Sequence, residues 1–244
     1  MRHNSSIAVI SIICPFYNEK ENLGELAHRL QKVVRDFKEP WEIIFVDDGS
    51  SDGGGDYLQT LIPSDELIRL LRLDGNHGLS TAIFAGLQAA KGDILATLDS
   101  DLQNPPEEIP KLLSLMKDAD IVTGVRKYRQ DSWVKKVSSK IANRIRRSVT
   151  RDHLEDVGCS LRVFRREVVP AFYPFDGMHR FFLSVAEAEG FKIKQVPVQH
   201  EARRRGKSKY GLRNRILGPL WDLFAVHWML RKKIRFRRRG EDHD

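Results

Sequence analysis

Short apolar runs and amphipathic stretches alternate along the first part of the chain. Residues 8–14 read AVISIIC, a run rich in β-branched side chains, and we expect a strand there that ends at Pro15. Residues 21–34 then carry apolar side chains at helical spacing, namely Leu23, Leu26, Ala27, Leu30 and Val34. This pattern predicts a strand followed by a helix whose apolar face packs against it.

The same alternation continues toward residue 100. Further strands are predicted over residues 42–46, 67–73 and 93–98. The helices between them are predicted over residues 53–61 and 79–90. Strands separated by single helices need right-handed crossovers, so we expect an α/β fold with a mostly parallel sheet covered by helices on both faces. Ligands of such sheets bind beyond the carboxyl ends of the strands, which predicts one shared rim for the loops 15–19, 47–52, 74–78 and 99–104.

The second half of the chain is less regular. Strands are predicted over residues 121–125, 160–164 and 192–198. Helices are predicted over residues 135–149 and 179–189, and an Arg/Lys-rich loop follows at 203–209. No linker of Gly, Ser and Pro separates the halves, so we interpret the chain as one domain with a C-terminal extension.

Length and composition favour a folded protein of a reducing compartment. The 244 residues are enough to bury a substantial core, and 41% of them are hydrophobic. The two cysteines, Cys14 and Cys159, cannot supply a disulfide framework or a four-cysteine zinc site. We expect neither a signal peptide nor a membrane span, because no run approaches the roughly 20 apolar residues that a span requires.

Charge is distributed unevenly along the chain. Residues 1–124 carry 11 Lys/Arg and 20 Asp/Glu, whereas residues 125–244 carry 30 and 13. An acidic half suits a hard cation, and a basic half suits phosphates, nucleic acid or an anionic membrane surface. Solvation of two different faces is the alternative explanation.

The candidate chemistry lies at the ends of the predicted strands. Asp99, Asp101 and Gln103 directly follow a strand and offer two carboxylates and an amide oxygen, the ligand type that Mg²⁺ and Mn²⁺ prefer, although such a D-x-D run is often only a solvated turn. Asp47 and Asp48 follow another strand, where a carboxylate could accept from a base or ribose, or could form an Asx turn. Residues 15–19 offer an aromatic ring for stacking, or simply an N-cap by Asn18. Residues 178–182 are interpreted as core aromatics rather than as part of an acceptor site.

Taken in order, these motifs resemble a known family. The motifs are Pro15-Phe-Tyr-Asn-Glu19, Asp47-Asp-Gly-Ser50, Gly75-Asn-His-Gly78, Asp99-Ser-Asp-Leu-Gln103 and Arg203-x-x-Gly206-x-Ser-Lys209-Tyr210. They are similar to the family-2 glycosyltransferases of the dolichol-phosphate mannose synthase type, over about residues 7–215. The resemblance implies a GT-A (Rossmann-like) fold and an inverting transfer of a hexose from a nucleotide sugar to a polyprenyl phosphate, with Mg²⁺ or Mn²⁺ as cofactor.

The resemblance also implies roles for individual residues. The nucleoside would be held by Pro15, Tyr17, Glu19, Val46 and Asp48, and Ser100 would also contact the nucleotide sugar. The metal would be held by Asp99, Asp101 and Gln103. The phosphates would be held by Arg126, Arg203 and Lys209. Among these residues, Asp101, Arg126 and Arg203 are expected to be catalytic, because cations stabilise the departing diphosphate.

The C-terminal segment is expected to lie on a membrane. We divide the chain into a catalytic domain, residues 1–211, and an amphipathic helix with a basic tail, residues 212–244. Projected on a helix, one broad face carries the apolar residues Ile216, Leu217, Leu220, Trp221, Leu223, Phe224 and Trp228. This face predicts an interfacial helix flanked by Arg and Lys. The alternative is that it packs on the catalytic domain or on a second copy of the chain.

The expected function is therefore transfer of a hexose from a donor of the GDP-mannose or UDP-glucose type to dolichyl or undecaprenyl phosphate. We expect a peripheral protein of the cytoplasmic, inner membrane face, with a homo-oligomer or a separate membrane protein as further partners and no nucleic acid. Two alternatives are a GT-A transferase with a soluble acceptor and a basic nucleic-acid-binding protein.

Overall fold

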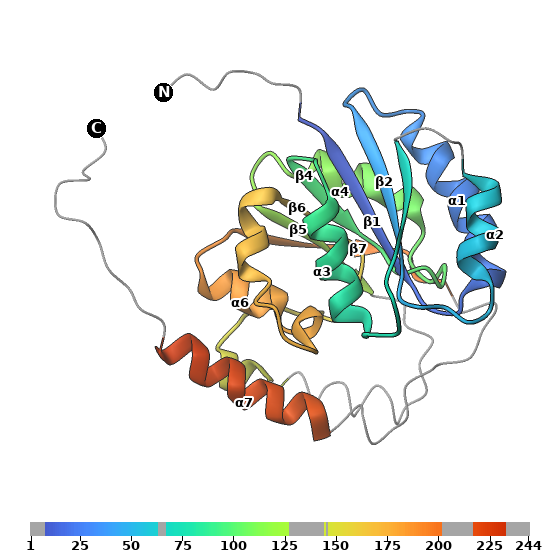
Figure 1. Ribbon diagram of the computed structural model, residues 1–244. Coiled ribbons are helices and arrows are strands. Elements are labelled where there is room, and N and C mark those ends of the chain that lie inside the picture. Colours follow the sequence, from blue (N-terminus) through green and yellow to red (C-terminus); the bar gives the residue numbers. More distant parts are fainter. Residues whose placement is uncertain (1–7, 63–66, 127–143, 145, 202–216, 233–244) are drawn as a thin grey trace, which may run out of the picture.

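The computed structural model describes residues 8–62, 67–126, 144, 146–201 and 217–232 (Figure 1). Within these residues a seven-stranded sheet has the order β3-β2-β1-β4-β6-β5-β7. The strands are β1 (Ile10–Phe16), β2 (Trp41–Asp47), β3 (Ile68–Arg72), β4 (Ile94–Thr97), β5 (Ile121–Arg126), β6 (Arg162–Arg165) and β7 (Ile193–Val198). Each of the seven strands corresponds to one of the segments that the sequence predicts as strands.

The sheet is mostly parallel, as expected. Strand β1 pairs in parallel with β2 and β4, β2 with β3, and β5 with β7, whereas β6 runs antiparallel to both β4 and β5. The expectation that β1 ends at Pro15 is wrong, because the strand continues to Phe16 beside β2. Pairing with β4 stops at Ile13, so the missing N–H of Pro15 points to the side where no ladder bond is needed.

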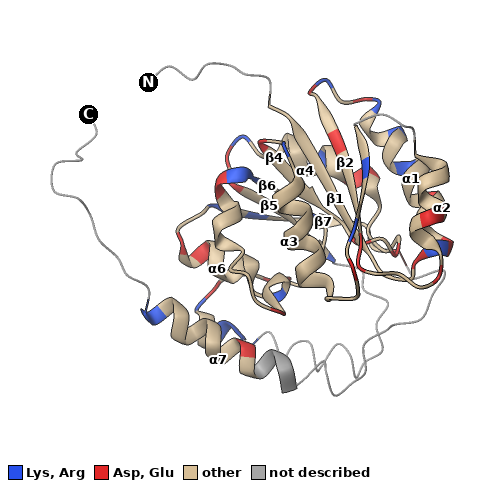
Figure 2. Ribbon diagram, viewed as in Figure 1, with Lys and Arg blue, Asp and Glu red and all other residues tan. Residues whose placement is uncertain are grey.

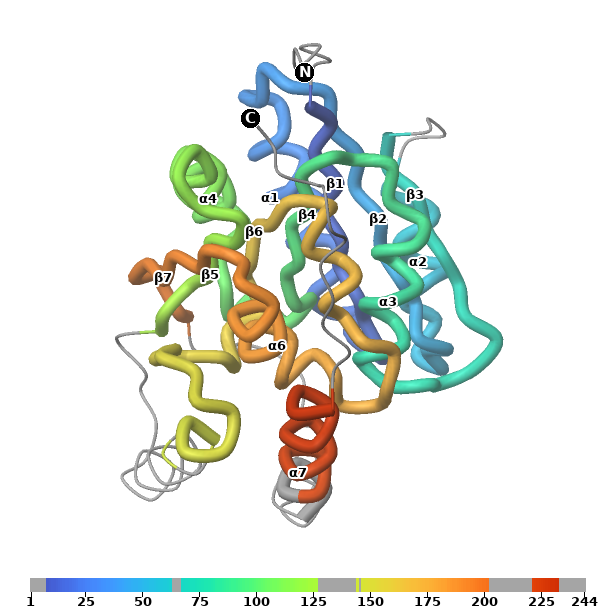
Figure 3. The backbone as a smooth tube through the Cα atoms, turned by 90° about the vertical axis from the view of Figure 1, so that its left-hand side faces the viewer, coloured from blue at the N-terminus to red at the C-terminus, as the bar shows by residue number. Residues whose placement is uncertain are grey.

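Helices cover both faces of the sheet (Figures 1 and 3). One face carries α1 (Lys20–Val34), α2 (Gly54–Leu61) and α4 (Ile109–Ser114), and the other carries α3 (Leu79–Ala89) and α6 (Phe182–Ala188). Short 3₁₀ helices lie at η1 (Pro106–Glu108), η2 (Arg166–Ala171) and η3 (Met178–Arg180).

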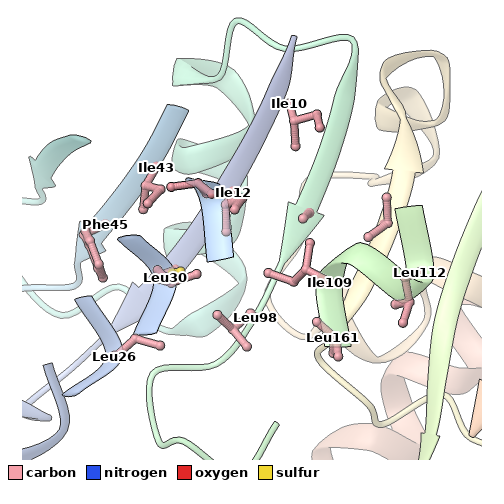
Figure 4. Packing of buried hydrophobic residues seen from close by; sticks show 14 of the residues in the cluster. Ile10, Ile12, Leu26, Leu30, Ile43, Phe45, Leu98, Ile109, Leu112 and Leu161 are labelled. Carbon is pink, nitrogen blue, oxygen red and sulfur yellow. The ribbon is translucent and has the colours of Figure 1, made fainter. Parts of the chain in front are cut away.

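Alternation along the strands divides the core in two. Ile12 of β1 packs with Leu26 and Leu30 of α1 (Figure 4). Its neighbour Ile13 packs on the other face with Leu87 of α3. All these side chains are buried. A sheet that is buried on both faces explains why the strands read as continuous apolar runs rather than as alternating ones.

Helix α7 (Leu217–Lys232) carries apolar side chains on two sides, whereas the helical projection of the sequence placed all of them on one face. Leu223 and Val226 are buried in the cluster that contains α6, whereas Trp221, Phe224 and Trp228 are exposed by 77%, 60% and 64%. The expectation that Leu223 shares a free apolar face with the tryptophans is therefore wrong. One side of the helix packs on the domain, and the other side is exposed.

Two polar contacts hold α7 in this orientation. The Asp222 carboxylate lies 3.8 Å from the guanidinium of Arg180, and the Nδ1 atom of His227 lies 2.6 Å from the carbonyl oxygen of Val149. Between Asp222 and Arg231, α7 contains no Asp, Glu, Lys or Arg (Figure 2). None of the described helices is both long and apolar enough to cross a bilayer.

The packing of α7 predicts different effects for two adjacent residues. Leu223→Ala should lower the free energy of unfolding by about 2 to 4 kcal/mol, because it leaves a cavity beside α6. Phe224→Ala, the matched control, should change it by less than about 0.5 kcal/mol, because that side chain is exposed. Urea denaturation of the full chain measures both. Equal effects of the two substitutions would contradict the packing described here.

Candidate active site

The carboxyl ends of β1 and β2 are joined by hydrogen bonds between their loops. The Oδ1 atom of Asn18 accepts from the N–H groups of Ser51 and Asp52, at 2.7 and 3.2 Å, and the N–H of Asn18 donates to the Ser50 hydroxyl at 2.9 Å. Asn18 adopts a left-handed conformation, with φ of 51°, that Asn tolerates well. The N-cap of α1 is Glu19, so the interpretation of Asn18 as an N-cap is wrong.

Asp48 joins the second loop to the third. Its Oδ1 atom accepts the N–H of His77 at 2.8 Å, and its Oδ2 atom accepts the N–H of Gly78 at 2.9 Å. The carboxylate is only 3% exposed. A Cβ atom at Gly49 would lie 2.3 Å from the carbonyl carbon of Gly75, so only glycine allows this close approach. Asp48 therefore fixes the rim, whatever else it binds.

Asp47 forms the turn that the sequence offered as an alternative. Its Oδ1 atom accepts the N–H of Ser50 at 2.8 Å, which is an Asx turn at the end of β2. The two adjacent aspartates thus have different partners. Asp47 shapes its own loop, and Asp48 holds the neighbouring one.

The D-x-D segment follows β4 at the same rim. Burial, together with the negative charge of Asp101, raises the pKa of Asp99 to about 6. Asp101 accepts the N–H of Gln103 at 3.1 Å, which turns the chain back. Leu102 between them has a left-handed φ of 61°, and its side chain is buried in the core. Burial of this leucine offsets the cost of about 1 to 2 kcal/mol for that backbone conformation.

This donor set fits a divalent cation. At Asp99 the effects of burial and of the Asp101 charge outweigh those of Arg162 and Arg126, and a bound cation would add positive charge that lowers the pKa of Asp99. No group of three or more His, Cys, Asp or Glu side chains with metal-binding geometry occurs among the described residues. Two carboxylates and the Gln103 amide leave other coordination positions for ligand oxygens, as is usual for Mg²⁺.

A pocket of about 320 Å³ opens beside Asp99. Its apolar wall is formed by Pro15, Leu79, Ile83, Leu98 and Val157. Its polar groups come from Asp99, Ser160, Arg162, His179 and Arg180. A mostly apolar hollow with a few convergent polar groups is the usual form of a small-molecule site.

Two arginines lie near enough to Asp99 to affect its pKa, and one of them, Arg162, also lines the pocket. Arg126 makes a bidentate ion pair with Asp156, with N–O distances of 2.8 and 2.9 Å, and these contacts raise the pKa of Arg126 despite its burial. Arg162 donates to the carbonyl oxygens of Val157, Cys159 and His179, at 2.7, 2.9 and 3.2 Å. Arg162 is thus a buried cation that donates to main-chain carbonyl oxygens of three described residues.

The remaining predicted residues are spread around the rim and beneath it. Tyr17 is half-buried, and Glu19 accepts from the side-chain amide of Asn22 at 2.6 Å. Val46 is fully buried beneath α3, so only its main chain is available to a ligand. Ser100 is also buried. Arg203 and Lys209 lie outside the described residues.

Sequence reasoning missed Ser80 and Arg162, which come from separate elements that no motif joined, and it assigned His179 to the core. The interpretation of residues 178–182 as core is confirmed for Met178, Phe181 and Phe182, which are buried. His179 and Arg180 instead line the pocket. The signal in the sequence for a pocket position was the polar pair His179-Arg180 within the otherwise apolar residues 178–182.

The chain is similar in sequence to a known family and to named proteins. The family described as Glycosyl transferase family 2 matches residues 11–172. A protein of Aeromonas hydrophila named undecaprenyl-phosphate 4-deoxy-4-formamido-L-arabinose transferase is 36% identical over 224 residues, covering 91% of this chain and 68% of the relative. A protein of the same name from Pectobacterium carotovorum is 40% identical over 219 residues, covering 88% of this chain and 66% of that one.

Solved structures have the same fold. Glucosyl-3-phosphoglycerate synthase from Mycobacterium tuberculosis, in complex with Mn²⁺, UDP and glucosyl-3-phosphoglycerate, aligns with a TM-score of 0.66 at 18% identity, over 97% of this chain and 87% of that one. A mannosyltransferase from Pyrobaculum calidifontis, in complex with GDP-Man and Mn²⁺, aligns with a TM-score of 0.65 at 18% identity, over 94% and 66%. This likeness confirms the expected GT-A type of fold.

The contacts of Asp48 yield a prediction that needs no ligand. Asp48→Asn turns one acceptor into an N–H donor that faces a main-chain N–H, so the free energy of unfolding should fall by about 1 to 3 kcal/mol. Hydrogen exchange should accelerate selectively at the amides of His77 and Gly78. Asp118→Asn, at an exposed position, is the control. Unchanged exchange at both amides would show that Asp48 does not hold this loop.

Proposed function

The chain belongs to glycosyl transferase family 2, and from this premise we propose that it transfers a hexose from a nucleotide diphosphate sugar to a polyprenyl phosphate. The observation that carries the proposal is the D-x-D segment at the end of β4, whose Asp99 lines a pocket that Arg162 and Arg180 also line. Relatives named undecaprenyl-phosphate transferases, 36% and 40% identical over most of the chain, support the choice of acceptor.

The donor would lie along the rim. We assign the divalent cation, Mg²⁺ or Mn²⁺, to Asp99, Asp101 and Gln103, and when bound it would neutralise charge on the diphosphate. Ser100 lies within the same turn. The nucleoside would lie against the loop of Pro15, Tyr17 and Glu19, and against the main chain of Val46. Asp48, already bound to two N–H groups, retains a second lone pair on each oxygen for a base or ribose.

The proposed reaction depends on positive charges that stabilise the departing diphosphate, and it needs no strong general base to activate the acceptor. An oxygen of the acceptor phosphate would attack the anomeric carbon as the bond from that carbon to the donor phosphate breaks, inverting the configuration. A phosphate monoester has a second pKa of about 6, so it is already largely ionised near neutral pH. Arg126, Arg203 and Lys209 are assigned to the phosphates, because the departing diphosphate gains negative charge.

A lipid acceptor requires the protein to meet a membrane surface, and α7 is suited to it. Trp221, Phe224 and Trp228 form an exposed aromatic stripe on the side of α7 that faces away from α6. The helix ends in Arg231 and Lys232, and residues 233–239 add five more Lys or Arg. Tryptophan side chains with flanking cations suit the boundary of an anionic bilayer.

We therefore propose a peripheral enzyme of the cytoplasmic membrane face. Residues 1–211 would form the catalytic domain, and residues 212–244 would form its membrane-contacting extension. Because Leu223 and Val226 are buried against that domain, the extension would place the catalytic rim at a fixed height above the lipid.

Label transfer tests the reaction. UDP-[¹⁴C]glucose and GDP-[¹⁴C]mannose are each incubated with the full chain and Mn²⁺, with either undecaprenyl phosphate or 3-phosphoglycerate as acceptor. We expect label in the lipid extract and none in phosphoglycerate, and excess EDTA should abolish transfer. Asp101→Asn should reduce transfer on the order of 100-fold, because it removes a charge from the cation site.

The control for that experiment is Asp118→Asn, which also removes one negative charge but lies far along the chain at an exposed position. Circular dichroism should be unchanged in both variants. Label in phosphoglycerate alone would replace the lipid acceptor by a soluble one. Full activity of Asp101→Asn, or activity in EDTA, would exclude the assigned cation site.

Membrane attachment is tested by changing the aromatic stripe without touching the buried side of α7. The triple variant Trp221→Ser, Phe224→Ser, Trp228→Ser should lose most of its sedimentation with phosphatidylglycerol vesicles and keep its thermal midpoint, since all three side chains are exposed. Attachment of the unmodified chain should weaken as salt is raised. Equal sedimentation of both proteins would contradict this role of the stripe.

A further inference from the structure

His179 lines the pocket that Asp99 also lines, and its ring contacts the side chain of a serine. It belongs to η3, and its Nδ1 atom lies 2.7 Å from the hydroxyl oxygen of Ser80 at the start of α3. The same hydroxyl oxygen accepts the N–H of Gly177 at 2.9 Å. Ser80 is 2% exposed, so its hydroxyl is buried.

These contacts determine which ring nitrogen carries the proton. The only acceptor that the described contacts offer to the buried Ser80 hydroxyl proton is the Nδ1 atom of His179. If Nδ1 carried the proton instead, the hydroxyl would be left with a buried, unpaired proton, which costs about 1 to 3 kcal/mol. The arrangement that satisfies every group places the ring proton on Nε2.

The surroundings also keep this ring uncharged. Burial lowers the pKa of His179 to about 3, and the positive charges of Arg180 and Arg162 act in the same direction. His179 is thus a neutral donor at any physiological pH. The described hydrogen bonds include no acceptor for the Nε2–H of His179. The residue lines the pocket.

The location of the pocket indicates what this donor meets. Asp99 belongs to the turn assigned to the cation and the diphosphate, so the group next to it is the sugar attached to that diphosphate. A volume of about 320 Å³ lies at the lower end of the range for small-molecule sites and suits one sugar ring better than a nucleotide.

We infer that His179 is a specificity-determining residue for the donor, whose Nε2–H donates a hydrogen bond to an oxygen substituent of the transferred sugar, and that Ser80 positions it. This inference rests on the proposed function. A neutral donor with a fixed tautomer discriminates well, because a sugar that lacks the matching oxygen leaves the N–H buried and unpaired.

Binding measurements separate the sugar from the nucleotide. Titration calorimetry with Mn²⁺ compares UDP with UDP-glucose and UDP-L-arabinose, and GDP with GDP-mannose, and the nucleotide sugar that the unmodified chain binds best is carried forward. His179→Asn should weaken binding of that nucleotide sugar about tenfold and leave the free nucleotide unchanged, because Asn cannot reach the position of Nε2.

Two further variants act as matched controls. His179→Gln places an amide N–H near the position of Nε2 and should stay within about threefold of the unmodified chain. Ser80→Ala removes the group that selects the tautomer, so binding of the nucleotide sugar should weaken while the free nucleotide is unaffected. A long-range ¹H–¹⁵N spectrum of the unmodified chain should show the Nε2–H tautomer of His179 at neutral pH.

The outcomes distinguish this inference from the function on which it rests. If free nucleotide binds with Mn²⁺ but His179→Asn leaves the nucleotide sugar unaffected, or weakens both ligands equally, the role of His179 is overturned and the proposed function stands. An Nδ1–H tautomer overturns it as well. If the unmodified chain binds neither nucleotide nor nucleotide sugar, the proposed function fails and the inference fails with it.

Discussion

The carboxylate of Asp48 is the contact on which the geometry of the rim depends. Parallel strands bring their carboxyl ends to one edge, but they do not fix the loops that follow. Asp48 does so with two hydrogen bonds to the main chain of His77 and Gly78, in a place so narrow that Gly49 cannot carry a side chain. The start of α3, and with it Ser80, is thereby held beside the end of β4. A site assembled from separate loops needs this kind of support to keep its geometry.

Buried charge is the second constraint, and it explains why the pocket is built to receive a ligand. Arg162 lies in the core with hydrogen bonds to three carbonyl oxygens, and Asp99 is the carboxylate of the pocket that lies near it. Asp99 in turn has its pKa raised by burial and by Asp101. Asp99 and Arg162 partly compensate each other's charge. A diphosphate with its cation would add charge of both signs beside this pair.

The sequence predicted the elements well because their signals are local. Apolar runs and helical spacing lie within single segments, and the D-x-D turn follows its strand directly. The errors have non-local causes: Pro15 continues β1 only because β4 stops pairing at Ile13, and Leu223 is buried only because α6 lies beside it. Ser80 and His179, 99 positions apart, carry no shared pattern at all. Their relationship exists only after the chain has folded.

Helix α7 connects the surface to the pocket through one ion pair. Asp222 on α7 lies 3.8 Å from Arg180, and Arg180 follows His179 in η3 and lines the same pocket. The exposed aromatic stripe and the pocket wall are therefore parts of one packed unit rather than two tethered pieces. Close packing leaves little free volume between these elements, so the position of α7 and that of the pocket wall depend on each other. Under the proposed function, the helix that would contact the lipid surface is therefore also the helix that packs beside η3.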